Sequence, residues 1–293
     1  MTIRFVSGAI ALGLAAAMNV VAAPAVDKET LVVAVEKNFQ NLDPQVAASG
    51  DSQRYAWQMF DTLYGFDPKG NLEPRVATSF KVSDDGLTYT YKLRSGIRFH
   101  NSDPLTAEDV KYSLERILDP AVKSTKRPYF SRVQSVRAID VDSIEIKLSG
   151  IDGAFHNKVA NNLFIVPKKY AMSLPDADAF GRKPIGSGPY KLKSYKVGQS
   201  LELDRFDGYF GDKPSIKHLI FKVLPEGASR VNALTANEVD IAIQVPTNYK
   251  EQIEQKPELK WIAVPVASPM YVRLYTKEPG SPLAKREVRQ ALN

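Results

Sequence analysis

The sequence predicts an α/β protein in which strands and helices alternate irregularly, and three observations support this. Residues 87–93 alternate apolar and polar side chains, which is the period of a strand buried on one face. Residues 107–118 place apolar side chains at the spacing of an amphipathic helix. The predicted elements do not follow the strand–helix–strand rhythm of a simple doubly wound sheet, so that architecture is excluded.

The N-terminal part begins with a strand and a helix. The β-branched run at 31–35 (LVVAV) predicts a short buried strand. Further along, Tyr55, Met59 and Leu63 lie four residues apart, so they are expected to share one face of a helix.

A small antiparallel sheet is expected around residues 87–93. The apolar pair Phe80 and Val82 precedes this strand, and the pair Ile97 and Phe99 follows it, so both pairs predict neighbouring strands.

The remaining elements are bounded by clear signals. Thr106 is a helix N-cap with acidic residues in the first turn, and Asp119-Pro120 ends that helix. A second helix at 228–236 has Asn237 available for a left-handed C-cap. Residues 286–293 (REVRQALN) are predicted to form the opening turns of another helix. Strands are predicted at 144–148, 190–195, 200–206, 218–223 and 239–243.

The first 25 residues have the layout of a secretory signal peptide. Arg4 precedes a short apolar run, no acidic residue occurs before Asp27, and Ala23-Pro24-Ala25 offers a small-x-small cleavage site. The run is shorter than the roughly 20 residues that a membrane-spanning helix needs. We therefore expect cleavage after Ala25 and a mature chain that begins at Val26.

The composition limits the cellular compartments and the classes of binding partner that are expected for this chain. The chain contains no cysteine, so it has neither disulfides nor the residue that carries a lipid anchor in exported lipoproteins. The formal net charge is +6, but basic and acidic residues are interspersed instead of forming the basic face of a nucleic-acid-binding protein. We expect a soluble monomer of the periplasm with no nucleic-acid partner.

No pattern predicts an enzyme or a metal centre. His100, His156 and His218 are far apart, and none has a second ligand at a metal-binding spacing. Without cysteine, a site for a soft metal is excluded. The segment 186–188 (GSG) lacks the spacing of a nucleophile elbow and is interpreted as a turn. We expect no catalytic residues and no cofactor.

Six segments become specific when taken together. They are NLDPQ (41–45), GNLEPRVATSFKVSDDGLTYTYKLRSGIRFH (70–100), PLTAEDVKYSLERI (104–117), PIGSGPYKLKSYKVGQSLELDRF (184–206), NEVDIAI (237–243) and VRQALN (288–293). In this order they resemble the family 5 extracellular solute-binding proteins, the oligopeptide- and dipeptide-binding proteins of ABC importers. The resemblance covers essentially the whole chain after the signal peptide.

The resemblance implies an α/β fold of the two-lobe periplasmic binding protein type, class II-like, in the large form with an extra subdomain in lobe one. Residues 26–65 and 184–265 would form the core of lobe one, residues 66–183 the inserted subdomain, and residues 266–293 the start of lobe two. Members of the family are much longer than this chain, and VRQALN falls early in lobe two, so the resemblance implies that most of lobe two is absent from it.

The implied function is that of the periplasmic substrate-binding component of an ABC transporter. Such a protein captures a peptide by hinge closure and delivers it to permease subunits in the inner membrane. Closure follows when the ligand binds the closed state more tightly than the open one. The charges that fix the ends of a peptide are expected in the absent part of lobe two.

The candidate ligand-binding residues implied by the resemblance lie in three places. Ala48, Ser49 and Gly50 follow the NLDPQ segment, although they also read as a helix N-cap. Tyr129 follows the helix at 107–118, and Pro269, Met270 and Tyr271 lie at the crossover into lobe two. Tyr271 is equally compatible with stacking on a ligand and with a place in the core.

Three alternatives stay open, and one of them is that this chain is a truncated product that does not bind ligand. The same family resemblance also covers non-peptide cargo: a metal chelate, haem, a sugar conjugate or an opine. From a different class, the chain would be a secreted hydrolase, which turnover without any transport partner would support.

Overall fold

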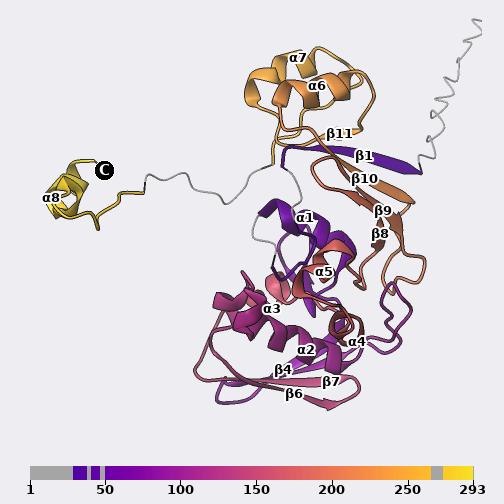
Figure 1. Ribbon diagram of the computed structural model, residues 1–293, viewed down its shortest axis with the longest axis vertical. Coiled ribbons are helices and arrows are strands. Elements are labelled where there is room, and N and C mark those ends of the chain that lie inside the picture. The colour runs from indigo at the N-terminus through magenta and orange to yellow at the C-terminus, as the bar shows by residue number, and fades with distance from the viewer. Residues whose placement is uncertain (1–28, 38–40, 47–49, 265–272, 293) are drawn as a thin grey trace, which may run out of the picture. The chain divides into compact units, whose positions relative to one another are not determined.

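The computed structural model describes residues 29–37, 41–46, 50–264 and 273–292. Its contacts divide the chain into two units, Met1–Val245 and Pro246–Asn293. The described part of the first unit contains three sheets (Figure 1). The described part of the second contains short helices joined by irregular chain, namely η3 (Thr247–Tyr249), α7 (Lys250–Glu254), η4 (Pro282–Ala284) and α8 (Arg286–Ala291).

The largest sheet has five strands in the order β11-β1-β10-β9-β8. Its centre is parallel, because β1 pairs in parallel with both β10 and β11, whereas β8 and β9 continue antiparallel. All five strands were predicted, but the last is shorter than its predicted range of 239–243. They are β1 (Thr30–Val35), β8 (Tyr190–Lys196), β9 (Ser200–Arg205), β10 (His218–Val223) and β11 (Ile241–Ala242).

A second, antiparallel sheet has the order β4-β5-β7-β6, and a third pairs only β2 with β3. The predicted alternation is confirmed, because Tyr89, Tyr91 and Leu93 of β5 are all buried. The strands are β2 (Tyr64–Phe66), β3 (Leu72–Pro74), β4 (Ala77–Val82), β5 (Thr88–Leu93), β6 (Val133–Asp140) and β7 (Ser143–Leu148).

The strand predicted at Ile97 and Phe99 is wrong. Both side chains are buried, but the segment makes only an isolated bridge between Arg98 and Pro104. The two edges of β5 are already occupied by β4 and β7, so no place beside it remains.

Helices of the first unit cover these sheets. They are α1 (Gly50–Met59), α2 (Ala107–Leu118), α3 (Phe155–Asn162), α4 (Lys168–Met172), α5 (Ala177–Arg182) and α6 (Gly227–Thr235), with 3-10 turns η1 (Pro120–Val122) and η2 (Arg127–Phe130). The predicted signals of α2 are confirmed: the Asp109 carboxylate accepts from the Thr106 backbone N–H at 2.9 Å, and Asp119 caps the end. Asn237 adopts the predicted left-handed conformation after α6, with φ of 58°.

Helix α1 ends earlier than predicted. Tyr55, Met59 and Leu63 are all buried, but the helix stops at Met59. In a continuing helix the Met59 carbonyl would accept from the N–H of Leu63. Here it accepts from the N–H of Gly188 at 2.9 Å, so a distant loop takes the place of the next turn.

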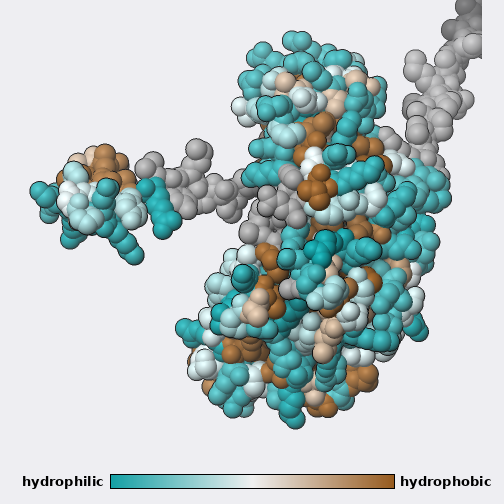
Figure 2. All heavy atoms as spheres, viewed as in Figure 1, coloured by the Kyte–Doolittle hydropathy of each residue, from teal (hydrophilic) through white to brown (hydrophobic). Residues whose placement is uncertain are grey.

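Strand β1, the middle of the three parallel strands in the five-stranded sheet, is buried on both faces, as expected for parallel strands, whereas β8, β9 and β10 bury one face and leave the other partly exposed. Val33 and Val35 of β1 belong to a core cluster with Tyr55 and Met59 of α1, whereas Ala34 packs with Ala233 of α6. The four-stranded sheet forms a separate core with α2 and α3. On the molecular surface seen in Figure 2, most exposed residues are hydrophilic, and the apolar residues are exposed in small separate areas. Within the described ranges, no helix combines the length and hydropathy required to cross a bilayer.

Candidate functional site

The three parallel strands of the large sheet end side by side. Val35 of β1 pairs with Val223 of β10, and Ala34 pairs with Ala242 of β11. We call residues 35–37, 223–225 and 242–245, which follow or end these strands, the carboxyl edge. Ligands of open α/β sheets bind outside the carboxyl ends of the strands, so this edge is the candidate binding surface of the first unit.

Arg230 of α6 lies buried behind this edge, with only 2% of its surface exposed. One guanidinium nitrogen, Nη1, donates to the carbonyl oxygens of Leu224 and Pro225, each at 2.7 Å. The other, Nη2, donates to the carbonyl of Gln244 at 2.7 Å. The side chain therefore bridges the segments that follow β10 and β11.

Gln244, at the end of the edge, has an unusual backbone. Its φ is 54°, in the left-handed region that residues other than glycine rarely adopt, and its side chain is exposed. Such conformations persist where the surroundings hold them and are often found at binding sites. The exposed amide can both donate and accept hydrogen bonds.

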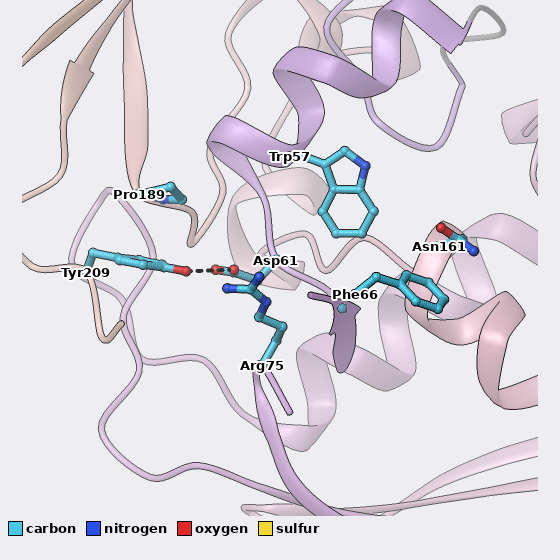
Figure 3. Close-up of a pocket in the computed structure, with 8 residues that line it drawn as sticks. Trp57, Asp61, Phe66, Arg75, Asn161, Pro189 and Tyr209 are labelled. Carbon is cyan, nitrogen blue, oxygen red and sulfur yellow. Dashed lines mark hydrogen bonds between the residues drawn. The ribbon is translucent and has the colours of Figure 1, made fainter. Parts of the chain in front are cut away.

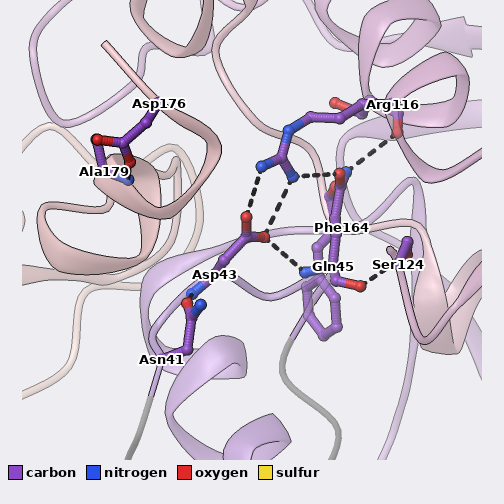
Figure 4. A network of polar contacts seen from close by, with 9 residues as sticks. Asn41, Asp43, Gln45, Arg116, Ser124, Phe164, Asp176 and Ala179 are labelled. Carbon is purple, nitrogen blue, oxygen red and sulfur yellow. Dashed lines mark hydrogen bonds and ion pairs between the residues drawn. The ribbon is translucent and has the colours of Figure 1, made fainter. Parts of the chain in front are cut away.

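A buried ion pair fixes the NLDPQ segment (Figure 4). Asp43 and Arg116 form a two-pronged contact, with Nη2 of Arg116 2.6 Å from one carboxylate oxygen and Nη1 3.2 Å from the other. Both side chains are almost fully buried. The NLDPQ segment is thus joined to α2, which carries Arg116.

Gln45 extends this network in three directions. Its side-chain amide donates to the carbonyls of Ser113 and Phe164 at 3.1 and 3.0 Å, and its Oε1 accepts from Arg116 at 2.8 Å. The hydroxyl of Ser124 donates to the Gln45 carbonyl at 2.7 Å. The segment that leads to residues 47–49 is therefore anchored to α2 and to the chain before η2.

The loop at 186–188 forms a second anchor, next to the end of α1. The Gly186 N–H donates to Nδ1 of His100 at 3.2 Å, which leaves Nε2 of His100 to donate to the Gly188 carbonyl at 3.0 Å. Burial lowers the pKa of His100 to about 4, so the ring is neutral at pH 7.

Asp61 binds both the same loop and Tyr209, and Figure 3 shows its contact with Tyr209. Its carboxylate accepts from the hydroxyl of Ser187 at 3.0 Å and from that of Tyr209 at 3.2 Å. Burial raises the pKa of Asp61 to about 6, although both hydrogen bonds and the charge of Arg75 act to lower it. Burial, followed by the Asp61 charge, raises the pKa of Tyr209.

Asp61 also lines a cavity of about 500 Å³. Figure 3 shows Trp57 and Phe66 around the cavity and the Arg75 guanidinium directed toward Asp61. Because the carboxylate already accepts two hydrogen bonds, the simplest function of this group is to join α1 to the loops at 186–188 and 206–210.

The candidate residues predicted from the sequence are only partly described. Gly50 is the first residue of α1, and Tyr129 lies in η2 with 47% of its surface exposed, so Tyr129 is not a core residue. Ala48, Ser49, Pro269, Met270 and Tyr271 lie outside the described residues.

Sequence reasoning missed Arg230, Asp61 and the Asp43–Arg116 pair. For Arg230 a signal existed, because it precedes Ala233 and Leu234 by three and four residues and so shares their helix face. A cation in an otherwise apolar stripe indicates a specific buried partner. Asp43 lies in the NLDPQ segment, but nothing local to that segment indicates its partner.

The described residues do not assemble a metal or catalytic centre. Among them, no cluster of three His, Asp or Glu side chains is placed to hold a metal ion. His100 bonds to backbone groups of the 186–188 loop, Nδ1 of His156 to the Tyr91 hydroxyl at 3.0 Å, and His218 to Asp204 at 2.7 Å. No described serine hydroxyl is paired with a histidine in these contacts.

The mixed five-stranded sheet, with its parallel centre, is the kind of sheet found in one lobe of a two-lobe binding protein. The family model of the bacterial extracellular solute-binding proteins, family 5 (middle), matches residues 71–293. This chain belongs to that family, whose members are periplasmic in Gram-negative bacteria. The predicted family and fold class are confirmed.

Individual relatives agree. The chain is 30% identical to the glutathione-binding protein GsiB of Escherichia coli K12 over 292 residues, which cover 98% of this chain and 55% of GsiB. The chain thus spans about half the length of the curated relatives it matches. All of the similar proteins named here are binding proteins.

Two solved structures share the fold. The oligopeptide-binding protein AppA of Bacillus subtilis, in complex with a nonapeptide, matches with a TM-score of 0.74 and 29% identity over 79% of this chain and 47% of AppA. AgaA of Agrobacterium tumefaciens, in complex with agropinic acid, matches with a TM-score of 0.74 and 28% identity over 78% of this chain and 46% of AgaA.

Proposed function

We propose that the protein containing this chain is the solute-binding component of an ABC importer. It captures a peptide between two lobes by hinge closure and delivers it to permease subunits of the inner membrane. The observation that carries this proposal is the family membership, together with relatives named for binding glutathione or an oligopeptide.

The carboxyl edge supports a binding function. It brings three strand ends together at the point where the first unit ends, and Gln244 presents an exposed amide there. We infer that the protein is a binder and not an enzyme, because the family consists of solute-binding proteins and the relatives named above are binding proteins.

The candidate ligand-contacting residues remain Ala48, Ser49, Gly50, Tyr129, Pro269, Met270 and Tyr271. One contact supports grouping the first four. Ser124 binds the Gln45 carbonyl, so the stretches that lead to Gly50 and to Tyr129 start from the same anchored point.

We also infer the organisation predicted from the sequence. Residues 26–65 and 184–265 form the core of lobe one, 66–183 its subdomain, and 266–293 the start of lobe two. In support, the five-stranded sheet takes its strands from 30–35 and 190–242, and the four-stranded sheet from 77–148. Residues 1–25 act as a cleaved signal peptide, and the mature protein is a periplasmic monomer without a lipid anchor.

One alternative cargo has a specific observation behind it. AgaA, which was crystallised with agropinic acid, resembles this chain as closely as AppA does. A non-peptide opine is therefore the second candidate ligand for the same binding mechanism.

Isothermal titration calorimetry of the natural gene product tests the proposal. The probes are glutathione, a nonapeptide and agropinic acid, each added to purified protein after partial unfolding and refolding to remove bound ligand. Binding of either peptide at one site supports the proposal. Binding of agropinic acid alone would show that the protein binds the alternative, non-peptide ligand. Hydrolysis of a peptide without stable binding would instead indicate an enzyme.

A further inference from the structure

Arg230 is a buried cation whose guanidinium binds backbone carbonyls. Among the described residues it forms no ion pair with a carboxylate, and its hydrogen bonds go to the carbonyls of Leu224, Pro225 and Gln244. A buried charged side chain without hydrogen-bond partners would be very costly in free energy. The three carbonyls supply those partners, so the carbonyls and Arg230 hold each other in place.

The three carbonyls are not a random set. Leu224 and Pro225 directly follow β10, and Gln244 follows β11, with β1 lying between these two strands. The backbone beside them is tied to β1 as well, because the N–H of Leu224 donates to Val35 and that of Ile243 to Ala34. Arg230 therefore closes a bridge over the central strand at the carboxyl edge.

The bridge also holds a strained residue. Gln244 has a left-handed φ of 54°, and its carbonyl is one of the three that Arg230 binds. Left-handed backbone at a residue other than glycine is disfavoured on its own, so this conformation needs an external contact to persist. The first unit ends one residue later, at Val245.

We propose that Arg230 is a positioning residue that holds the carboxyl edge in the conformation that the ligand meets. It acts through the Gln244 backbone and does not touch the ligand. This proposal rests on the proposed binding function. Only arginine suits the task, because its planar fork carries five N–H donors, whereas a lysine has one nitrogen and cannot reach both sides of the bridge.

Hydrogen–deuterium exchange of the natural full-length gene product, with calorimetry on the same samples, tests the bridge. Arg230→Met removes the donors and keeps most of the volume, and Arg230→Lys keeps the charge. Arg205→Met is the matched control, because Arg205 donates to the Pro214 carbonyl at 3.1 Å at the end of β9, near the opposite edge of the same sheet.

We expect the amides of Leu224 and Ile243 to exchange at least about tenfold faster in Arg230→Met, while the amides of β5 keep their wild-type rates. Affinity for whichever peptide probe binds the wild type, glutathione or a nonapeptide, falls by about tenfold, within the usual range of coupling between sites. Arg230→Lys resembles Arg230→Met, and Arg205→Met changes neither readout.

Several results would overturn the proposal. Wild-type exchange in Arg230→Met would show that the bridge does not hold the edge, and equally faster exchange in β5 would show a general loss of stability. Wild-type exchange rates and affinity in Arg230→Lys would mean that a positive charge alone is sufficient. Unchanged affinity despite faster local exchange would show that the conformation of the carboxyl edge does not affect ligand binding. If the wild type binds no peptide, the proposed function fails, whereas the exchange rates still decide whether the bridge exists.

Discussion

At the scale of single residues, two glycines allow the loop at 186–188 to lie directly against α1. A Cβ on Gly186 would lie 2.0 Å from the Met59 carbonyl oxygen, and one on Gly188 would lie 2.5 Å from the Met59 carbonyl carbon. Both contacts are to backbone, which cannot rotate away. Close approach, and not a left-handed conformation, is therefore the reason for glycine here.

Gly188→Ala is expected to lower the free energy of unfolding by about 2–4 kcal/mol, because the loop and the end of α1 must separate. Gly153→Ala is the control, since a Cβ there meets nothing within 4 Å, and we expect a change of less than about 0.5 kcal/mol. Urea unfolding followed by circular dichroism measures both. Equal stability of the two variants would contradict the close packing.

The raised pKa of Asp61, which binds the 186–188 loop, predicts that the free energy of unfolding depends on pH. Its pKa is raised from 3.8 to about 6, so the folded state binds the proton more tightly than the unfolded state. The group therefore costs stability as the pH rises from about 4 to 6, by on the order of 3 kcal/mol. Asp61→Asn does not titrate, so its stability relative to the wild type should rise between pH 4.5 and 7.5.

Urea unfolding at the two pH values measures this difference. The stability that asparagine loses equally at both pH values, through a lost hydrogen bond, does not contribute to the change between them. Asp212→Asn, a change at an exposed carboxylate, serves as the control. A constant difference between Asp61→Asn and the wild type across this range would show that Asp61 is not the titrating group.

Tyr129 is the described candidate whose side chain is best placed for a test of ligand contact. It is 47% exposed in η2, so its removal should disturb packing little. Tyr129→Ala is expected to weaken peptide binding by about 1–2 kcal/mol, the usual cost of losing an aromatic contact. Calorimetry checks this against Met172→Ala, a change at an exposed apolar side chain on α4. Equal affinities would remove Tyr129 from the site.

At the scale of elements, the Asp43–Arg116 pair joins the NLDPQ segment to α2. Both charges are buried, so removing one leaves the other without its partner. Asp43→Asn or Arg116→Met should each lower stability by about 3–5 kcal/mol, whereas the double variant should lose less than the sum.

The exposed pair Arg137–Glu145 provides the matched control, with single changes costing less than about 1 kcal/mol. Urea unfolding of the single and double variants measures the coupling. Additive losses at Asp43 and Arg116 would contradict the direct interaction seen in the structure.

Elements could be predicted wherever their signals are local. The period of β5, the caps of α2 and the left-handed Asn237 all depend on residues within a few positions of each other. The end of α1 could not be predicted, because the N–H that donates to the Met59 carbonyl belongs to Gly188, far along the chain. The bridge of Arg230 was missed for the same reason, since its acceptors depend on how β10 and β11 meet.

At the scale of the whole molecule, a binding protein works only if its ligand distinguishes two states. A ligand with equal affinity for the open and closed forms would shift nothing, however tightly it bound. In the first unit, the Asp43–Arg116 network anchors the segment that precedes residues 47–49, and Arg230 binds the Gln244 carbonyl at the carboxyl edge. If the protein functions as we propose, we expect these anchors to keep one wall of the binding site unchanged while ligand binding favours the closed state.

Native mass spectrometry of the natural gene product, purified gently from the periplasm of its own host, tests peptide capture most directly. We predict a folded chain that begins at Val26 and carries a series of small masses, which collisional activation releases and fragmentation identifies as peptides. Protein that emerges without such masses, and stays free after incubation with glutathione and a nonapeptide, would contradict the proposed function.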